Sequence, residues 1–444
     1  MTSCTIQENF YHLVDHGTDQ LKGDEILLLN LQSEASDFVR FNRSKVRQPG
    51  TVQQSVLSCR LIDGKKHCSI EQTLTGDADL DRAIVEQTIV DLRAKMEHIP
   101  EDPHLLFNTT PMSTEHSAGA QNFNSKEMVE DITAAAQGVD LVGILASGSI
   151  HRGFGNSLGQ KNWFSTNNFN FDFSLVHSAD KAVKSGYAGS KWESPEFSSV
   201  MNLAQRKLKA LERPAIDLKP DLYDVFLSPV AVWEILGLLS WGGFSLQAQR
   251  SKSSTLLKLV AGEVGLDPRV SISENIAEGA SPQFQAQGFL SPDSISLIDQ
   301  GQHAGSLISP RTAKEYDIQT NGASAMETPS SLDMQGGDLK ADSILEQLDT
   351  GIHVGNLWYL NYSDRIGCRM TGMTRFATFW VKDGEVVAPL NVLRFDDTVY
   401  NILGSNLKGL TKERQFLLSA GSYFQRSTAS AHLPGVISKL RFTL

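Results

Sequence analysis

The hydrophobic pattern of the first part of the chain predicts antiparallel strands. Runs rich in β-branched and aromatic residues lie at 37–48, 55–62 and 65–74. Asp63 and Gly64 separate the last two runs, and this dipeptide favours the positive φ angles of a tight hairpin turn. We therefore expect these runs to form neighbouring strands of one sheet.

Helical and strand periodicities follow along the same part of the chain. Apolar residues recur at gaps of three and four in 81–99, and similar amphipathic patterns start at Ser125 and Ser194. Residues 169–176 alternate apolar and polar side chains, which is typical of a strand with one buried face. A proline ends the last helix, and we place a domain boundary between residues 215 and 216.

The second half of the chain has mainly β patterns behind one helix. A strand at 222–227 precedes an apolar helix at 229–241, and a hairpin is predicted at 376–395 around an Asp-Gly turn. The stretch 271–345 is rich in Gly, Ser, Asp and Gln, which is typical of long loops that are functional or mobile.

These elements predict an α+β fold in two parts. Residues 1–215 combine an antiparallel sheet with several helices. Residues 216–444 are expected to form a mostly β, barrel-like domain with one leading helix.

Composition and charge exclude several classes of function. The 444 residues carry 40 Lys and Arg against 51 Asp and Glu, a net charge of −11, which disfavours direct nucleic-acid binding. The longest apolar runs, 139–146 and 230–239, are far shorter than the ~20 residues of a membrane span. No export signal starts the chain, and its cysteines are too sparse for a disulfide scaffold. We therefore expect a cytoplasmic protein with reduced thiols and no membrane contact.

Two local motifs come close to catalytic sequences without matching them. His12 and His16 have the spacing of a zinc-binding helix, but no glutamate follows His12, so we interpret them as part of an ordinary amphipathic helix. Ser157 lies in a G-x-S-x-G sequence, yet strand-like residues follow it where a nucleophile elbow needs a helix. We interpret that segment as a turn, and an activated Ser157 remains the alternative.

Candidate ligands for a metal or an anion lie on the late strands. They are His353, Cys368 and Arg375, and the first two could meet across a hairpin. We favour separate placement, because cysteine is commonly buried as a plain hydrophobic residue. Lys184 belongs to a lysine cluster near Tyr187, which we interpret as a solvated surface rather than a basic binding site.

Four ordered segments together resemble the TldD/PmbA family. They are GSIHRGFGNSLGQKNWFSTNNFNFDFSLV (148–176), DKAVKSGYAGSKW (180–192), YDVFLSPVAVWEILGLL (223–239) and a long segment at 351–395. The resemblance covers most of the chain, from about Arg40 to the last strand. It implies a cytoplasmic protein of a TldD/TldE peptidase system, in which two family members pair as a heterodimer and degrade unstructured peptides.

The resemblance also indicates the subunit type. In the TldD-type subunit, a helix with His-Glu-x-x-x-His and a cysteine near the C-terminus hold the metal. The matching helix here has Gly237, Leu238 and Gly242 at those positions, and Cys368 lies well short of the C-terminus. Glycine and leucine side chains cannot bind a metal. The chain therefore resembles the TldE/PmbA-type subunit, with no catalytic residue, metal or cofactor of its own and with zinc expected in a TldD-like partner.

We hypothesise that the sheet edge of such a subunit binds extended peptides through main-chain hydrogen bonds. Strands around 353–359 and 373–381 are expected to face the channel, with His353, Asn356 and Arg375 as substrate-binding residues. The expected partner is a TldD-like metallopeptidase subunit, and a homodimer remains an alternative.

Two other functions stay open. The chain could be a self-sufficient hydrolase that uses His353 with Cys368, or Ser157 with a nearby base. It could instead be a pure interaction protein, since the family's older description ties it to modulation of DNA gyrase. The acidic charge argues against direct DNA contact in that case but not against contact with a protein.

Overall fold

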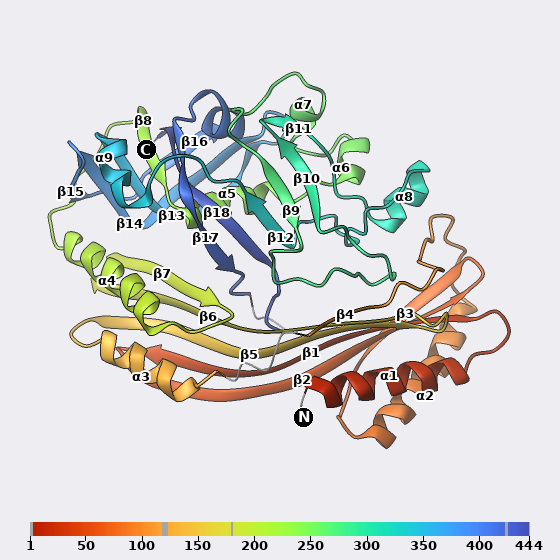
Figure 1. Cartoon of the computed structure of the whole chain (residues 1–444). Helices are drawn as coiled ribbons and strands as arrows, with labels where there is room; N and C mark the ends of the chain where they lie inside the picture. The colour runs from red at the N-terminus through yellow and green to blue at the C-terminus, as the bar shows by residue number, and fades with distance from the viewer. Residues whose placement is uncertain (1–2, 118–122, 179–180, 422–424, 444) are drawn as a thin grey trace.

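The chain is described by a computed structural model that covers residues 3–117, 123–178, 181–421 and 425–443. Two β-sheets lie one above the other: the N-terminal sheet crosses the lower part of Figure 1, and the C-terminal half covers it from above. The predicted α+β class is confirmed. Among the described helices, none has the length and apolar character needed to cross a membrane.

In the described part of the chain, the N-terminal sheet has seven strands, in the order β3-β2-β1-β5-β6-β4, with β7 also paired to β6. Neighbouring strands are antiparallel, except that β4 runs parallel to β6. The strands are β1 (Ile26–Asn42), β2 (Lys45–Asp63), β3 (Lys66–Thr73), β4 (Thr114–Ser117), β5 (Asp140–Asn156), β6 (Lys161–Ser178) and β7 (Lys181–Gly189).

The alternation predicted for residues 169–176 is observed along β6. Phe169, Phe171 and Phe173 are buried on the outer face of the sheet. The intervening Asn170 and Asp172 point toward the C-terminal half. Because successive side chains of a strand point to opposite faces, this part of the sheet has an apolar outer face and polar inner positions.

Four helices cover the N-terminal sheet: α1 (Ser3–Asp19), α2 (Ala78–Met96), α3 (Ser125–Ala135) and α4 (Ser194–Ala210). The first two lie beneath one end of the sheet (Figure 1), where Phe10 and Ile89 join a core that contains Leu29 and Trp163. The apolar stripe predicted at 81–99 is buried in this core. The other two helices pack against the phenylalanines of β6.

The hairpin between β1 and β2 departs from the sequence pattern. That pattern predicts one strand at 37–48, but the structure places a turn inside it at Arg43 and Ser44. Their φ angles are 50° and 57°, in a region that usually selects Gly, Asn or Asp. Residue types therefore gave no signal for this turn.

Among residues 181–421 and 425–443, eleven strands form the C-terminal sheet, along the path β11-β10-β9-β12-β18-β8-β13-β14-β15, with β16 paired to β14 and β17 to β18. The strands are β8 (Leu222–Leu227), β9 (Ile272–Asn275), β10 (Ser294–Asp299), β11 (Gln302–His303), β12 (Ser331–Met334), β13 (Gly351–Asp364), β14 (Arg369–Lys382), β15 (Glu385–Pro389), β16 (Arg394–Thr398), β17 (Gly409–Leu418) and β18 (Ser430–Arg441). Over the described residues this path does not close, so the sheet is open and the predicted barrel-like form is wrong. Two parallel pairings, β8 with β13 and β12 with β18, arise from long connections that hairpin signals cannot reveal.

The stretch 271–345 contributes short strands of this sheet, β9 to β12, in addition to loops. It is fixed in part by the buried carboxylate of Glu274, which accepts hydrogen bonds from the backbone N–H of Ser330 at 2.9 Å and of Ser331 at 3.1 Å. The remaining short helical elements are α6 (Leu246–Arg250), α7 (Leu257–Val260), α8 (Pro310–Tyr316), η1 (Ala341–Ser343), α9 (Ile344–Leu348) and η2 (Asn401–Ser405).

Helix α5 (Pro229–Leu239) packs against β13 and β18. Ser228 caps it, because its Oγ accepts a hydrogen bond from the backbone N–H of Ala231 at 3.2 Å. Most of the helix is buried, as its apolar sequence predicts. Val230, Trp233 and Glu234 are only partly buried and share one side at i, i+3, i+4 spacing.

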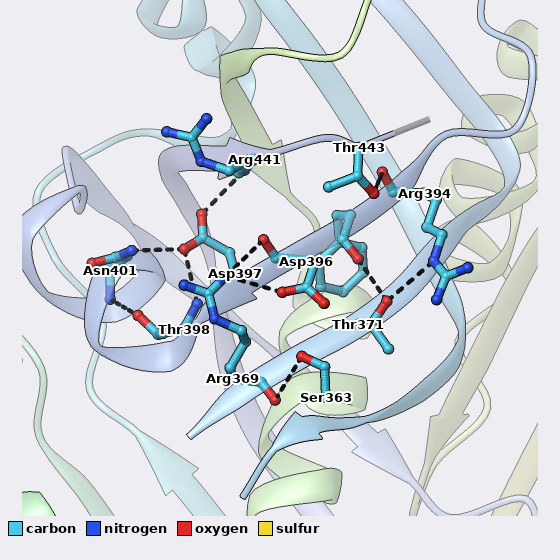
Figure 2. A network of polar contacts seen from close by, with 11 residues as sticks. Ser363, Arg369, Thr371, Arg394, Asp396, Asp397, Thr398, Asn401, Arg441 and Thr443 are labelled. Carbon is cyan, nitrogen blue, oxygen red and sulfur yellow. Dashed lines mark hydrogen bonds and ion pairs between the residues drawn. The ribbon is translucent and has the colours of Figure 1, made fainter. Parts of the chain in front are cut away.

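A polar network fixes β18 to the neighbouring β16 (Figure 2). The buried carboxylate of Asp397 accepts hydrogen bonds from Asn401 Nδ2 at 2.7 Å and from the backbone N–H of Arg441 at 3.1 Å. Beside it, Arg369 Nη1 lies 2.9 Å from Asp396 Oδ1. Since donors of the chain itself engage these carboxylates, we assign the network to the stability of the fold.

Arg426, which follows β17, connects the two layers. Its backbone N–H donates to Glu34 Oε2 at 2.5 Å. Its guanidinium donates to the backbone oxygens of Gly148 at 3.3 Å and Asn168 at 3.0 Å, and also to the Asn168 side chain. Arg426 and Glu34 are both buried, so the C-terminal half is held on the inner face of the N-terminal sheet by a buried polar contact.

Replacing this arginine should therefore destabilise the fold. We expect Arg426→Met to lower the free energy of unfolding by about 3 kcal/mol, because it leaves the buried oxygens of Gly148 and Asn168 without their donor and removes the positive charge beside Glu34. The exposed Arg394 provides a control, and Arg394→Met should cost less than about 1 kcal/mol. Thermal and denaturant unfolding of the two variants measures the difference, and equal losses would contradict this role.

Candidate functional site

A cavity of about 210 Å³ lies between the two layers, and we call it the interlayer cavity. β6 and β7 supply one wall, and α5, β13 and β17 supply the other. Asn170 and Asp172 reach it from β6, while Trp233 and Glu234 reach it from α5. The alternation on β6 and the helical spacing on α5 thus bring polar groups from both halves of the chain together.

Glu234 has an unusual environment at this cavity. Its Oε2 accepts a hydrogen bond from the backbone N–H of Leu357 at 2.5 Å, and the Asn356 side chain also hydrogen-bonds to the carboxyl group. Burial raises the pKa of Glu234 to about 7, and these bonds and the charge of Lys184 offset only part of that effect. At neutral pH the carboxyl group therefore exchanges between its protonated and ionised forms.

Asp172 and Lys184 face Glu234 from the N-terminal sheet. Lys184 Nζ lies 3.9 Å from Asp172 Oδ2. Burial raises the pKa of Asp172, and the charge of Lys184 partly counteracts this. The interpretation of Lys184 as part of a solvated surface is incomplete, because this residue lines the cavity. Two acidic groups and one basic group thus converge on one space.

Two strand edges border the same cavity. Residues 184–188 of β7 and 415–418 of β17 line it, and the two strands come close together there. In the described part of the chain, β7 pairs only with β6, and residues 415–418 pair only with β18. A side-chain bond from Asn170 Nδ2 to the Leu418 oxygen, at 3.4 Å, partly occupies the second edge. Main-chain groups on both sides of the cavity are therefore available to an extended ligand.

The three predicted substrate-binding residues do not lie together. Asn356 lines the interlayer cavity and is buried. His353 is buried between the rings of Phe226 and Phe379, at centroid distances of 5.2 and 6.3 Å. Burial lowers the pKa of this histidine to about 3, so it is neutral.

Arg375 lies outside the cavity, on an exposed surface. Its guanidinium stacks against the rings of Trp358 and Phe376, at 5.9 and 5.6 Å from their centroids. Tyr359, next to Trp358, is 75% exposed. Arg375 therefore belongs to an aromatic surface that is separate from the cavity.

The hydrolase alternatives find little support in the geometry. His353 and Cys368 lie near opposite ends of the β13–β14 hairpin, roughly 30 Å apart at the rise of a β-strand. Cys368 is fully buried, and burial raises the pKa of its thiol to about 12. Ser157 lies in the turn between β5 and β6, where its Oγ accepts a hydrogen bond from the backbone N–H of Leu27 at 3.1 Å. The turn interpretation of this segment therefore holds.

The side chains at Gly237, Leu238 and Gly242, at and after the end of α5, have no atom that could bind a metal. Gly237 follows Trp233 and Glu234 on the cavity side of the helix, and a Cβ atom added to it would meet nothing within 4 Å. A side chain would therefore have room there, but glycine has no donor atom. Leu238 is buried as part of the core, and Gly242 has a φ of 90°, which disfavours any side chain. The three positions together offer no zinc ligand.

One cluster of ligand-type residues in the described chain lies elsewhere, at Glu278, Asp333 and His432. Arg414 already engages it: its Nη1 donates to Asp333, and its Nη2 lies 3.7 Å from Glu278. Asn275 Nδ2 also donates to Asp333 at 3.1 Å. Because a guanidinium neutralises the carboxylates, we assign no metal to this cluster.

The sequence analysis missed Glu234 and Asp172 as site residues. Both stood within recognised patterns: Asp172 is a polar position of the alternating strand, and Glu234 is a single charge in an apolar helix. A charged side chain in a buried helix needs a polar partner, and this requirement could have identified Glu234 as a site residue. Their meeting across two layers depends on contacts between residues far apart in the chain.

Comparisons with known proteins agree with this architecture. Residues 220–442 match a family model described as the PmbA/TldA metallopeptidase C-terminal domain. The structure of TldE from Thermococcus kodakarensis is similar with a TM-score of 0.78 and 14% identity, over 98% of this chain and 99% of that one. No curated protein sequence matches the chain.

Two candidate modulators of DNA gyrase also share the fold. The one from Thermotoga maritima gives a TM-score of 0.74 at 12% identity, over 99% of this chain and all of that one. The one from Bacteroides thetaiotaomicron gives 0.71 at 13% identity, over 98% of both chains. At such identities these likenesses establish the fold and nothing further.

The raised pKa of Glu234 makes stability depend on pH. Its ordinary pKa is near 4.5, so the folded state holds this proton more tightly than the unfolded state, and stability is lost as the pH rises through about 7. We expect Glu234→Gln to be more stable than the native chain at pH 8 by about 1–3 kcal/mol, with the difference shrinking toward pH 5. Denaturant unfolding at both pH values measures this, with Glu385→Gln at an exposed position as the control. A pH-independent difference would contradict the assigned environment.

Proposed function

Because the chain belongs to the PmbA/TldD metallopeptidase family, we propose that it is a zinc-free, TldE-like subunit of a peptidase complex. In this function it supplies part of the cleft in which an unstructured peptide is held. The single observation that carries the proposal is the interlayer cavity, which is bordered by two strand edges and faced by the polar side of α5. The likeness in fold to TldE from Thermococcus kodakarensis supports the choice of subunit type.

The proposed binding mode uses the main chain of the substrate. An extended peptide can add to a free strand edge and satisfy its own backbone groups there, which requires no particular sequence. In a folded protein most strands already pair within their own sheets, so an unstructured peptide is the favoured ligand. The buried amide of Asn356 and the ring of Trp233 line the same space and give side chains of the peptide a polar and an apolar contact.

Catalysis is assigned to a second subunit in this proposal. A TldD-like partner would hold zinc and supply the chemistry of peptide hydrolysis, while this chain positions the substrate. We place the complex in the cytoplasm and expect a heterodimer, with self-association as the competing outcome. The gyrase-modulator description of two relatives in fold favours one further candidate, an interaction protein that binds another protein without processing peptides.

The chain purified alone should therefore contain no stoichiometric zinc and should not cleave a denatured peptide. Adding a TldD-like subunit from the same organism should produce cleavage that a chelator abolishes. Metal analysis by mass spectrometry and a fluorescent peptide assay measure the two properties. Stoichiometric zinc with chelator-sensitive activity in the isolated chain would contradict the proposal, and a stable complex without cleavage would favour the interaction protein.

Alanine substitutions locate the peptide channel. Asn356→Ala should reduce cleavage by the reconstituted pair roughly tenfold, because it removes a buried polar contact in the cavity. Arg375→Ala should have a comparable effect only if the channel extends over the aromatic surface near Trp358. Initial rates at low peptide concentration measure both. Unchanged rates for both variants would count against a channel at these strands.

A further inference from the structure

The residues that line the interlayer cavity include more acidic than basic side chains. Glu234 enters from α5, Asp172 from β6, and Lys184 and Tyr187 from β7. The cavity-lining residues of β13 and β17 are uncharged. When both carboxyl groups are ionised, one ammonium group faces two carboxylates, so the cavity has a net charge of −1.

A protonated amine complements this arrangement. Two hydrogen bonds to Glu234 come from Leu357 and Asn356, and a carboxylate has about four acceptor sites, so acceptor capacity remains. An ammonium group donates three hydrogen bonds and would bring the charge of the cavity to zero. A carboxylate ligand would instead meet two like charges for one favourable contact with Lys184.

The volume of the cavity and the strand edges beside it favour the end of an extended peptide as the ligand. Its volume of about 210 Å³ is below the ~300–1,000 Å³ of pockets that enclose a drug-sized ligand. Residues 184–188 of β7 and 415–418 of β17 line it, and a main chain could continue along these edges by strand pairing. An amine followed by an extended main chain is the N-terminus of a peptide.

We propose that the interlayer cavity binds the free α-amino group of a peptide, with Glu234 and Asp172 as its acceptors and the edges of β7 and β17 pairing with the residues that follow. This inference rests on the proposed function, which it deepens by naming the end of the substrate that the chain recognises. The same chemistry would also admit a free polyamine, and the experiment separates the two.

The test compares two versions of one unstructured octapeptide with a C-terminal fluorophore, one with a free N-terminus and one N-acetylated. Binding to the full chain, alone and with its TldD-like partner, is measured by fluorescence anisotropy. The free amine should bind roughly ten- to a hundredfold more tightly, the range expected for a charge-assisted hydrogen bond. Glu234→Gln should reduce the affinity for the free amine to that of the acetylated peptide, and the control Glu385→Gln should leave it unchanged.

The pH profile adds an independent readout. Affinity for the free amine should rise from pH 6 to about 7.5 as Glu234 ionises and should fall above about pH 8, where the α-amino group loses its proton. The acetylated peptide lacks the amine and the Glu234→Gln variant lacks the ionising carboxyl group, so both should give flat profiles.

Each outcome bears on a different claim. Equal affinities for the two peptides would overturn the inference and leave the proposed function in place. Absence of binding by either peptide, with or without the partner, would overturn the proposed function together with the inference. Spermidine that competes for the cavity while the free and acetylated peptides bind equally would assign it to small amines and likewise overturn the inference.

Discussion

The strict alternation of side chains along β6 is the constraint on which the interlayer cavity depends. Burial of Phe169, Phe171 and Phe173 under the outer helices fixes the strand so that Asn170 and Asp172 face inward. A shift of the strand by one residue would exchange the two faces, with phenylalanines at the cavity and an aspartate in the core. The position of the polar groups therefore follows from the packing of the opposite face.

A second constraint acts on helix α5, which lies across the cavity from β6. It is apolar on most sides because it is enclosed by the C-terminal sheet, and only a narrow side remains for polar chemistry. That side has Glu234 and then Gly237, so the helix presents a carboxyl group and open space. Arg426 holds the two halves together through Glu34 and Asn168 and does not line the cavity.

Local patterns were sufficient to predict several parts of the fold. The helix predicted at 81–99, the alternation at 169–176 and the apolar helix predicted at 229–241 depend on neighbouring residues, and the structure has them as α2, β6 and α5. The turn at Arg43 and Ser44 was missed because its residue types do not favour positive φ. The open C-terminal sheet was missed because its parallel pairings join distant segments.

The candidate site was predictable only in part, for the same physical reason. Asn356 lines the interlayer cavity, whereas His353 lies in the core because neutral imidazole packs well between aromatic rings. Glu234 and Asp172 are 62 positions apart in the chain, and only the stacking of the two layers brings them to one space.

Hydrogen–deuterium exchange of the full chain, with and without an unstructured peptide, tests the central claim most directly. Binding between the layers predicts slower exchange of backbone amides at 184–188 of β7 and 415–418 of β17, with little change on the outer helices α1 and α2. Unchanged exchange at both strand edges in the presence of bound peptide would contradict the account.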